Sequence, residues 1–433
     1  MAQEIEDQAE NLGRSTSGVL KDRTVTEERG GQPVPRPTVS ARQWQLAHGT
    51  AAVNWMHSSG VAHRMLADIC TAVETTVEWE VAGNAGWARR VIERFPAVRD
   101  ECDKLRFSDP AQVLAYLINH VPDRYCRMFQ VLERLLAVGQ LPVGKRDNFA
   151  AIDIGAGPGP GIFAIRSFYA ALACYARLHD AEWAVMPLRR ADIVEYSQAM
   201  PRVMRRFAQA LFLLEQDQIG SLGTGLAGAY PCGEDLARSA FPLGEVFRDF
   251  SVFDAPHRHH DARLQRAEDL YRDDDLELSL EGARRLAYKE APDLPSGYAM
   301  VSMMNFLTPG SDAFTRFSGS ISQLMRGALI PGGMILVLGS GSEDYKGIYE
   351  KLDQRARAVG LTLMDGFDAR LPAVGRDDQK VMIAVLVRRM WNMLEALAGD
   401  VRKTKEQLPA KLYDASKQYG FSAFRARVYR RGA

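Results

Sequence analysis

The sequence predicts an α/β fold, in which a mostly parallel sheet has helices on both faces and follows an all-helical N-terminal unit. Three observations predict it. Short apolar strands alternate with long apolar helices from residue 149 onward, which favours a parallel sheet covered on both sides. A glycine-rich turn joins the first strand to the first helix, and residues 41–145 repeat apolar side chains at helical spacing.

The composition excludes several classes of protein. The chain has 433 residues, 46% of them apolar, and 54 basic residues balance 54 acidic ones, so no overall charge favours nucleic acid or an anionic membrane. Five cysteines without a CxxC pair indicate a reducing compartment. No apolar run approaches the ~20 residues that span a bilayer, and the acidic N-terminus lacks the apolar core of a signal peptide. We therefore expect a cytoplasmic protein with no membrane segment.

The N-terminal part divides into a tail and a helical cap. Residues 1–40 are rich in Gly, Pro, Ser and charge, so we expect a disordered tail. Residues 41–147 form the predicted helical cap. Within it, Ser108-Asp109-Pro110 starts a helix, with Ser108 at the cap and Pro110 just inside. Pro122 is expected to break or kink that helix.

The α/β part alternates strands and helices, with one interruption. Strands are predicted at 149–154, 190–195, 298–303, 333–338 and 381–387, and helices at 162–178, 199–214, 321–328 and 345–359. Residues 215–295 mix a Gly-rich loop, a histidine cluster and an acidic run, so we interpret them as an insertion that also carries the third strand. Residues 250–254 are the candidate for that strand.

The turn after the first strand reads Asp153-Ile154-Gly155-Ala156-Gly157-Pro158-Gly159-Pro160-Gly161. Its glycines let the backbone approach a ligand, and the following helix offers free N–H groups. The dinucleotide pattern G-x-G-x-x-G fails here, because its last glycine falls on Pro160 or Ile162. The pattern D-x-G-x-G-x-G is matched in full.

This turn resembles the first motif of class I S-adenosylmethionine-dependent methyltransferases, whose sheet is Rossmann-like. The resemblance covers about residues 148–390 and implies S-adenosylmethionine as cofactor, with the amino-acid part of the cofactor over the glycine loop. It implies that Asp153 organises the cofactor ammonium, that Glu195 takes the two ribose hydroxyls and that Tyr196 lies against the adenine. The implied cofactor-binding set is Asp153, Gly155, Ala156, Gly157, Pro158, Gly159, Glu195, Tyr196 and Asn305. The predicted strand at 381–387 would be the antiparallel final strand of this family.

The acceptor is less well defined by the sequence. Met303-Met304-Asn305-Phe306-Leu307 lacks the prolines of amino-methylating DNA enzymes, although Ser302 and Asn305 remain candidates for substrate or cofactor contact. Pro231-Cys232 resembles a cytosine-methylating pair but lies in the insertion. We therefore predict methyl transfer to a small-molecule or peptide-like acceptor. A non-catalytic cofactor-binding protein is one alternative.

The other alternative is an RNA- or ribosome-associated protein. Residues 114–125 faintly resemble methyltransferase-like proteins of mitochondrial small-subunit ribosome assembly, whose cysteine cluster is not reproduced here. The C-terminal segment 391–433 is basic and aromatic, which suggests RNA contact or an amphipathic segment packed on the domain.

Two histidine sites complete the candidates. The cluster at 257–261 offers a general base or a solvated loop, and we predict no metal site. His120 either faces the cofactor cleft or has a packing role.

Overall fold

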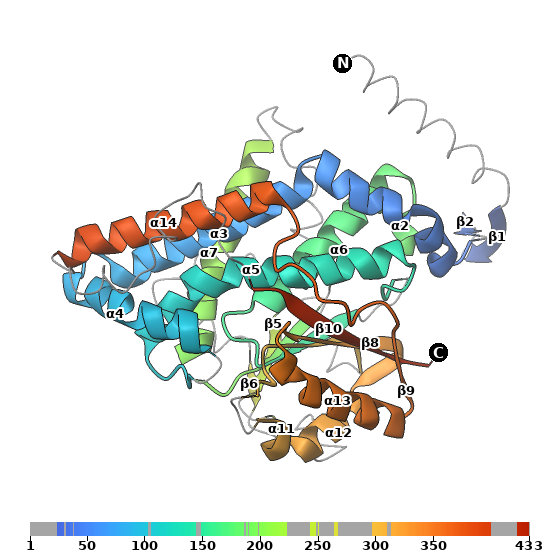
Figure 1. Cartoon of the computed structure of the whole chain (residues 1–433). Coiled ribbons are helices and arrows are strands. Elements are labelled where there is room, and N and C mark those ends of the chain that lie inside the picture. Colours follow the sequence, from blue (N-terminus) through green and yellow to red (C-terminus); the bar gives the residue numbers. More distant parts are fainter. Residues whose placement is uncertain are drawn as a thin grey trace.

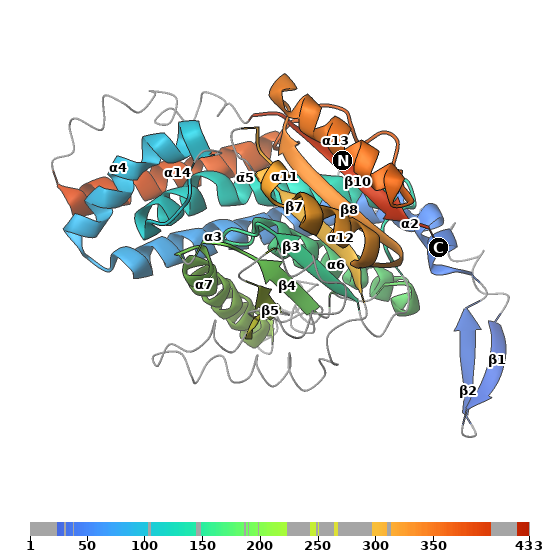
Figure 2. The same ribbon diagram turned by 90° about the horizontal axis from the view of Figure 1, so that it is seen from below.

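A computed structural model describes residues 24–29, 32–37, 39–102, 105–143, 149–185, 188, 190–197, 199–222, 243–247, 250, 264–266, 297–309, 313–399 and 422–432. A layer of long helices lies over one face of a single large sheet, and shorter helices lie on the other face (Figures 1 and 2). None of the helices in the described ranges is long and apolar enough to cross a membrane.

The sheet has eight strands in the order β6-β5-β4-β3-β7-β8-β10-β9. Their bounds are β3 (Ala150–Ile154), β4 (Arg190–Val194), β5 (Leu243–Phe247), β6 (Leu264–Arg266), β7 (Tyr298–Met304), β8 (Leu329–Ser340), β9 (Leu361–Leu363) and β10 (Phe424–Arg431). Strands β5, β4, β3, β7 and β8 are parallel, whereas β10 is antiparallel to β8 and β9. An antiparallel last strand inserted beside the fifth is typical of class I methyltransferases, so the predicted fold class is confirmed.

Two separate cores explain why these sequences form buried strands. Every residue of β3 and β7 is buried, as expected for parallel strands covered on both faces. Along β8 the side chains alternate between the two cores. Met334, Leu336 and Leu338 enter the larger core beneath the long helices, while Ile335 and Val337 enter the smaller core on the opposite face.

The helices divide between the two faces in the same way. The larger core is covered by α2 (Ala41–Ser58), α3 (Val61–Val81), α4 (Ala85–Glu101), α5 (Pro110–Ala137), α6 (Pro160–Leu178), α7 (Ala199–Leu222) and α14 (Asp377–Ala398). The smaller core is covered by α11 (Ala313–Arg316), α12 (Ser318–Gly327) and α13 (Lys346–Ala358). Short 3₁₀ turns η2 (Glu182–Ala184) and η5 (Glu343–Tyr345) complete the described elements.

The strand predicted at 381–387 is wrong, because these residues lie inside helix α14. Its buried positions follow helical spacing from Gln379 through Ile383, Leu386 and Met390 to Leu394. The helix packs against α3, α4 and α5, so it extends the N-terminal helical unit. The antiparallel final strand is instead β10, which comes from the segment 391–433. The sheet therefore includes part of that segment.

Helix α5 is not broken at Pro122, so the predicted break is wrong. It runs from Pro110 to Ala137 through Pro122 without a break. Proline removes one hydrogen bond from a helix interior. Here both turns around Pro122 are buried among neighbouring helices, and this packing holds the helix together. The predicted start at Pro110 is confirmed, but the predicted cap at Ser108 is wrong. Asp109 caps the helix by accepting a hydrogen bond from Ala111 N at 3.0 Å.

Two further segments differ from expectation. The third strand of the sheet is β5, not residues 250–254, of which only Phe250 is described. Within the segment expected to be disordered, β1 (Thr24–Arg29) and β2 (Gln32–Pro37) form an antiparallel hairpin that pairs with no other strand of the described chain. Most of the insertion at 215–295 lies outside the described residues.

Candidate functional site

The glycine loop leaves the carboxyl end of β3 and is tied to the end of β4. Gly155 N donates to the carbonyl of Val194 at 2.8 Å. Gly155, Gly157 and Gly159 have φ of 66°, 58° and 88°, a region that L side chains rarely adopt. A Cβ at Gly155 would also lie 2.5 Å from the Phe306 ring. The loop therefore needs these glycines to hold its shape.

Glu195 fixes this loop against the second strand. Its Oε2 accepts a hydrogen bond from Gly157 N at 2.7 Å, and its Oε1 accepts one from Ser197 N at 2.8 Å. The residue is only 8% exposed. A carboxylate has about four acceptor sites shared between its two oxygens. A pair of neighbouring hydroxyls is the donor that two fixed, adjacent oxygens suit best.

Asp153 lies beneath the loop. It is 1% exposed, and Ser302 Oγ donates to its Oδ1 at 2.6 Å. Burial raises the pKa of the Asp153 carboxyl to about 7, and the charge of Glu195 adds to the rise. The hydrogen bonds from Ser302 and from the Ile162 backbone oppose it. Asp153 thus ties β3 to β7 and to the start of α6.

Ser302 shares this buried position. Ser302 is 0% exposed, and its hydroxyl donates to Asp153. The side chain therefore stabilises the contact between β7 and β3 and does not face an acceptor. The polar pair Asp153–Ser302 shapes the loop from below.

Asn305 marks the end of the fourth strand. It has a φ of 53°, which asparagine tolerates better than most residues, and its N donates to the Leu338 carbonyl at 2.8 Å. Among the described residues its buried Oδ1 has no hydrogen-bond partner. Leaving a buried acceptor unpaired costs about 1–3 kcal/mol, so a ligand donor would be favoured there. The ammonium of S-adenosylmethionine fits this requirement.

Tyr196 is 73% exposed beside Glu195, and the Arg316 guanidinium lies 5.5 Å from its ring centre. An exposed aromatic ring next to this carboxylate could pack against the flat face of a purine. Ala156 and Pro158 lie within the buried glycine loop. The structure thus brings together the loop, Glu195 and Tyr196 at the edge where β3 and β4 end.

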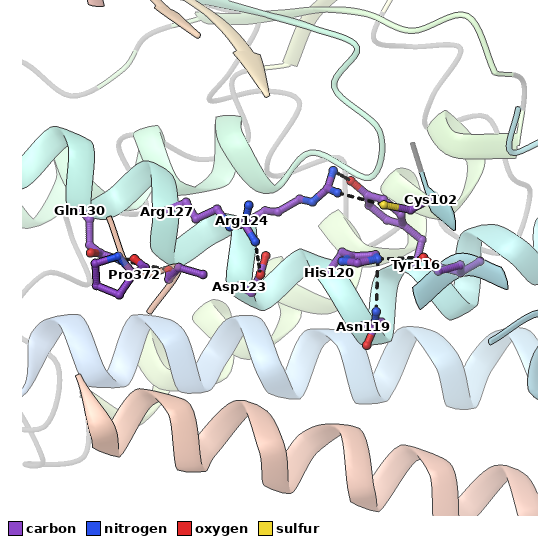
Figure 3. Close-up of polar contacts among 11 residues, drawn as sticks. Cys102, Tyr116, Asn119, His120, Asp123, Arg124, Arg127, Gln130 and Pro372 are labelled. Carbon is purple, nitrogen blue, oxygen red and sulfur yellow. Dashed lines mark hydrogen bonds and ion pairs between the residues drawn. The ribbon is translucent and has the colours of Figure 1, made fainter. Parts of the chain in front are cut away.

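Helix α5 forms a wall beside the loop that sequence reasoning missed. An atom of the Tyr116 ring lies 4.0 Å from where a Cβ at Gly157 would be. The segment before α5 joins the same site, since Ser197 Oγ donates to the Phe107 carbonyl at 2.8 Å. Arg124 donates to the Tyr116 hydroxyl, and its guanidinium lies 4.8 Å from the Tyr116 ring centre (Figure 3). Eight residues apart, Tyr116 and Arg124 share a face of one helix, which is the only signal in the sequence.

His120 belongs to this network and has a packing role (Figure 3). Its Nε2 lies 3.1 Å from the Val98 carbonyl and 3.2 Å from the Asn119 amide. Burial lowers the pKa of His120 to about 3, and the charge of Arg124 adds to this effect. The ring is therefore neutral and bonded within the helical cap, so it is no candidate for a general base.

The remaining residues that the sequence suggested for a functional site are either buried or outside the described part of the chain. Among the described residues no cluster of His, Cys, Asp and Glu could hold a metal ion. The histidine cluster at 257–261 and Pro231-Cys232 lie outside the described residues. Phe424 and Tyr429 are 0% exposed within β10, so these two aromatics are unavailable to stack on bases.

The chain is similar in structure to several methyltransferases of low sequence identity. Neither a protein-family model nor a curated protein sequence matches the chain. A methyltransferase from Thiobacillus denitrificans bound to S-adenosylhomocysteine is 12% identical, with 78% of this chain and 97% of that chain covered and a TM-score of 0.30. Phosphoethanolamine N-methyltransferase 2 from Haemonchus contortus is 14% identical over 76% and 61% of the two chains, with a TM-score of 0.30. YjhP from E. coli is 11% identical over 78% and 98%, also at 0.30.

The fold is that of the class I S-adenosylmethionine-dependent methyltransferases. The strand order, with its antiparallel β10 between β8 and β9, and the glycine loop after β3 define this fold.

Proposed function

We propose that the chain binds S-adenosylmethionine at the carboxyl ends of β3 and β4 and transfers its methyl group to a small-molecule or peptide-like acceptor. The observation that carries the proposal is the Glu195 carboxylate, held by Gly157 N at 2.7 Å at the junction of the glycine loop and the second strand. A fixed double acceptor at this junction supports the proposal, because the family binds the cofactor ribose at the end of the second strand.

Each residue of the site has a distinct task in this proposal. Glu195 accepts hydrogen bonds from the ribose hydroxyls, and Asn305 Oδ1 accepts one from the ammonium group. Tyr196 covers the adenine, and Tyr116 closes the site from the helical cap. Asp153 acts indirectly by holding the loop.

The sulfonium of the bound cofactor supplies an activated methyl group, so the chain contributes mainly alignment. Holding an acceptor in line with the methyl group reduces the entropy cost of the reaction. A general base is required only if the acceptor atom carries a proton.

The acceptor class follows from charge and burial. Basic and acidic residues balance over the whole chain, and two aromatics of the basic C-terminal segment are buried in the sheet. Both facts favour a small or peptide-like acceptor over RNA. The five cysteines without a CxxC pair favour a cytoplasmic location.

Calorimetric titration with S-adenosylmethionine and S-adenosylhomocysteine tests the cofactor site. We expect micromolar binding of both, weakened about tenfold or more in Glu195→Gln, because a charged acceptor contributes about 1.5–3 kcal/mol. Glu350→Gln, an exposed carboxylate on α13, is the matched control and should leave binding unchanged. Thermal unfolding of each variant separates a lost contact from a lost fold. Equal affinity in the wild type and Glu195→Gln would refute the assignment.

A further inference from the structure

A second cavity lies at the opposite edge of the sheet from the glycine loop. It has a volume of about 230 Å³ and is lined at the amino ends of β3, β7 and β8, by the end of β10 and by the first turns of α2. We call it the distal cavity. Strand β3 separates it from the glycine loop, and its five residues span roughly 16 Å.

Two arginines dominate the charge of the distal cavity. Arg42 from α2 and Arg430 from β10 line it, and no carboxylate is among its described lining residues. Burial lowers the pKa of the Arg430 guanidinium, and the positive charge of Arg42 lowers it further. Arg430 donates to the neutral amide oxygen of Gln140. Within the described ranges neither arginine forms an ion pair, so the two cations face one cavity without compensation.

The helix that carries Arg42 adds to this positive potential. Ser40 caps α2, and no acidic residue lies in its first turn, although a helix N-terminus favours negative charge. A cation in the first turn is unfavourable unless an anion lies nearby. Arg42 is exposed and Arg430 is half-buried, so an anion in the distal cavity would be attracted by both charges.

A buried acceptor completes the cavity. Gln45 is 0% exposed, and its Nε2 donates to the Leu141 carbonyl at 3.0 Å, which fixes the orientation of the amide. Among the described residues its Oε1 has no partner. An occupant of the distal cavity therefore gains from carrying a hydrogen-bond donor as well as a negative charge.

We propose that the distal cavity is a second ligand site, which binds a small phosphate monoester that carries a hydroxyl or amino group. The phosphate lies between Arg42 and Arg430, and the donor reaches Gln45 Oε1. Two guanidinium groups match the double charge of a phosphate better than the single charge of a carboxylate, and their planar donors suit its oxygens. The volume is below the roughly 300–1,000 Å³ of pockets for drug-sized ligands, so the occupant is the size of a sugar phosphate.

Calorimetry on the full chain at low salt tests this site, with ribose 5-phosphate, inorganic phosphate and ribose as probes. We expect ribose 5-phosphate to bind tighter than inorganic phosphate, and ribose not to bind. Arg42→Gln and Arg430→Gln should each weaken ribose 5-phosphate binding at least tenfold, and added salt should weaken it in the wild type. Arg357→Gln, an exposed arginine on α13, is the control and should bind as the wild type does.

Titration of the same variants with S-adenosylhomocysteine separates the two sites. Unchanged cofactor affinity in Arg42→Gln, together with lost phosphate binding, would support a separate site. The absence of ribose 5-phosphate binding at millimolar concentration, or equal binding in Arg42→Gln, Arg430→Gln and the wild type, would overturn the proposal. Equal affinity for inorganic phosphate and ribose 5-phosphate would overturn the role of Gln45.

Discussion

Replacing Asp153 by Asn should stabilise the fold at alkaline pH. Burial, with the nearby charge of Glu195, raises the pKa of this carboxyl from 3.8 to about 7 in the folded chain. Between these values the folded state keeps a proton that the unfolded state has lost, so this group makes stability fall as pH rises. Each pKa unit is worth about 1.4 kcal/mol, so the cost above pH 7 approaches about 4 kcal/mol.

The Asp153→Asn side chain cannot ionise. Its amide oxygen can accept from the Ile162 backbone N–H, and its amide N–H can donate to the Ser302 hydroxyl. We therefore expect the variant to be more stable than the wild type by about 2–4 kcal/mol at pH 8.5. The difference should shrink steadily as the pH falls from 7 to 4. Urea unfolding of both proteins at four pH values between 5 and 8.5 measures this difference.

His120 makes the comparison of two proteins necessary. Its pKa is lowered to about 3 in the fold, so below pH 6.5 it makes stability rise with pH, opposite to Asp153. The dependence of the wild-type unfolding free energy on pH therefore combines the opposite effects of Asp153 and His120. The difference between the wild type and Asp153→Asn isolates the effect of Asp153. Asp368→Asn, an exposed position, is the control and should follow the wild type. Parallel stability profiles for Asp153→Asn and the wild type would refute the reasoning.

Two further predictions concern stability. Glu215→Gln should destabilise the fold by about 3–5 kcal/mol in urea unfolding. Glu215 accepts two hydrogen bonds from the buried Arg166, at 2.8 and 2.7 Å, and the substitution removes the negative charge that faces this guanidinium. A loss below about 1 kcal/mol would show that this ion pair between α6 and α7 is not important for stability. His120→Gln should lose less stability than the wild type when the pH falls from 6.5 to 5, by about 2 kcal/mol, because the buried imidazole no longer resists protonation. Identical acid profiles of His120→Gln and wild type would contradict the buried, neutral state of His120.

The sequence predicts the central strands well because their signal is local. Strands β3, β4, β7 and β8 are apolar runs bounded by turns, and the structure places each where the run occurs. The glycine loop is equally local, because three positive φ angles within five residues require glycine. Glu195 could be selected as a candidate site residue because it stands directly after β4, the second strand of the predicted sheet.

The predictions fail where tertiary packing, and not the local sequence, determines the secondary structure. Residues 381–387 are rich in Val, Ile and Leu and have high strand propensity, but Met390 and Leu394 continue their apolar face at helical spacing and pack on the helical cap. In β10 the arginines suggested RNA, although buried and half-buried residues alternate as in a strand. The contact of Tyr116 with the glycine loop depends on how α5 lies against the sheet, which no short segment specifies.

The position of β10 sets an order for assembly during synthesis. Strand β9 is joined to the sheet through β10, although it precedes β10 by about sixty residues in the chain. Until Phe424–Arg431 has left the ribosome, β8 is an open edge with unpaired backbone groups, and β9 has no place in the sheet. Closure of the sheet therefore waits for β10, and nascent chains that stop short of β10 would expose the unpaired edge of β8 to their neighbours.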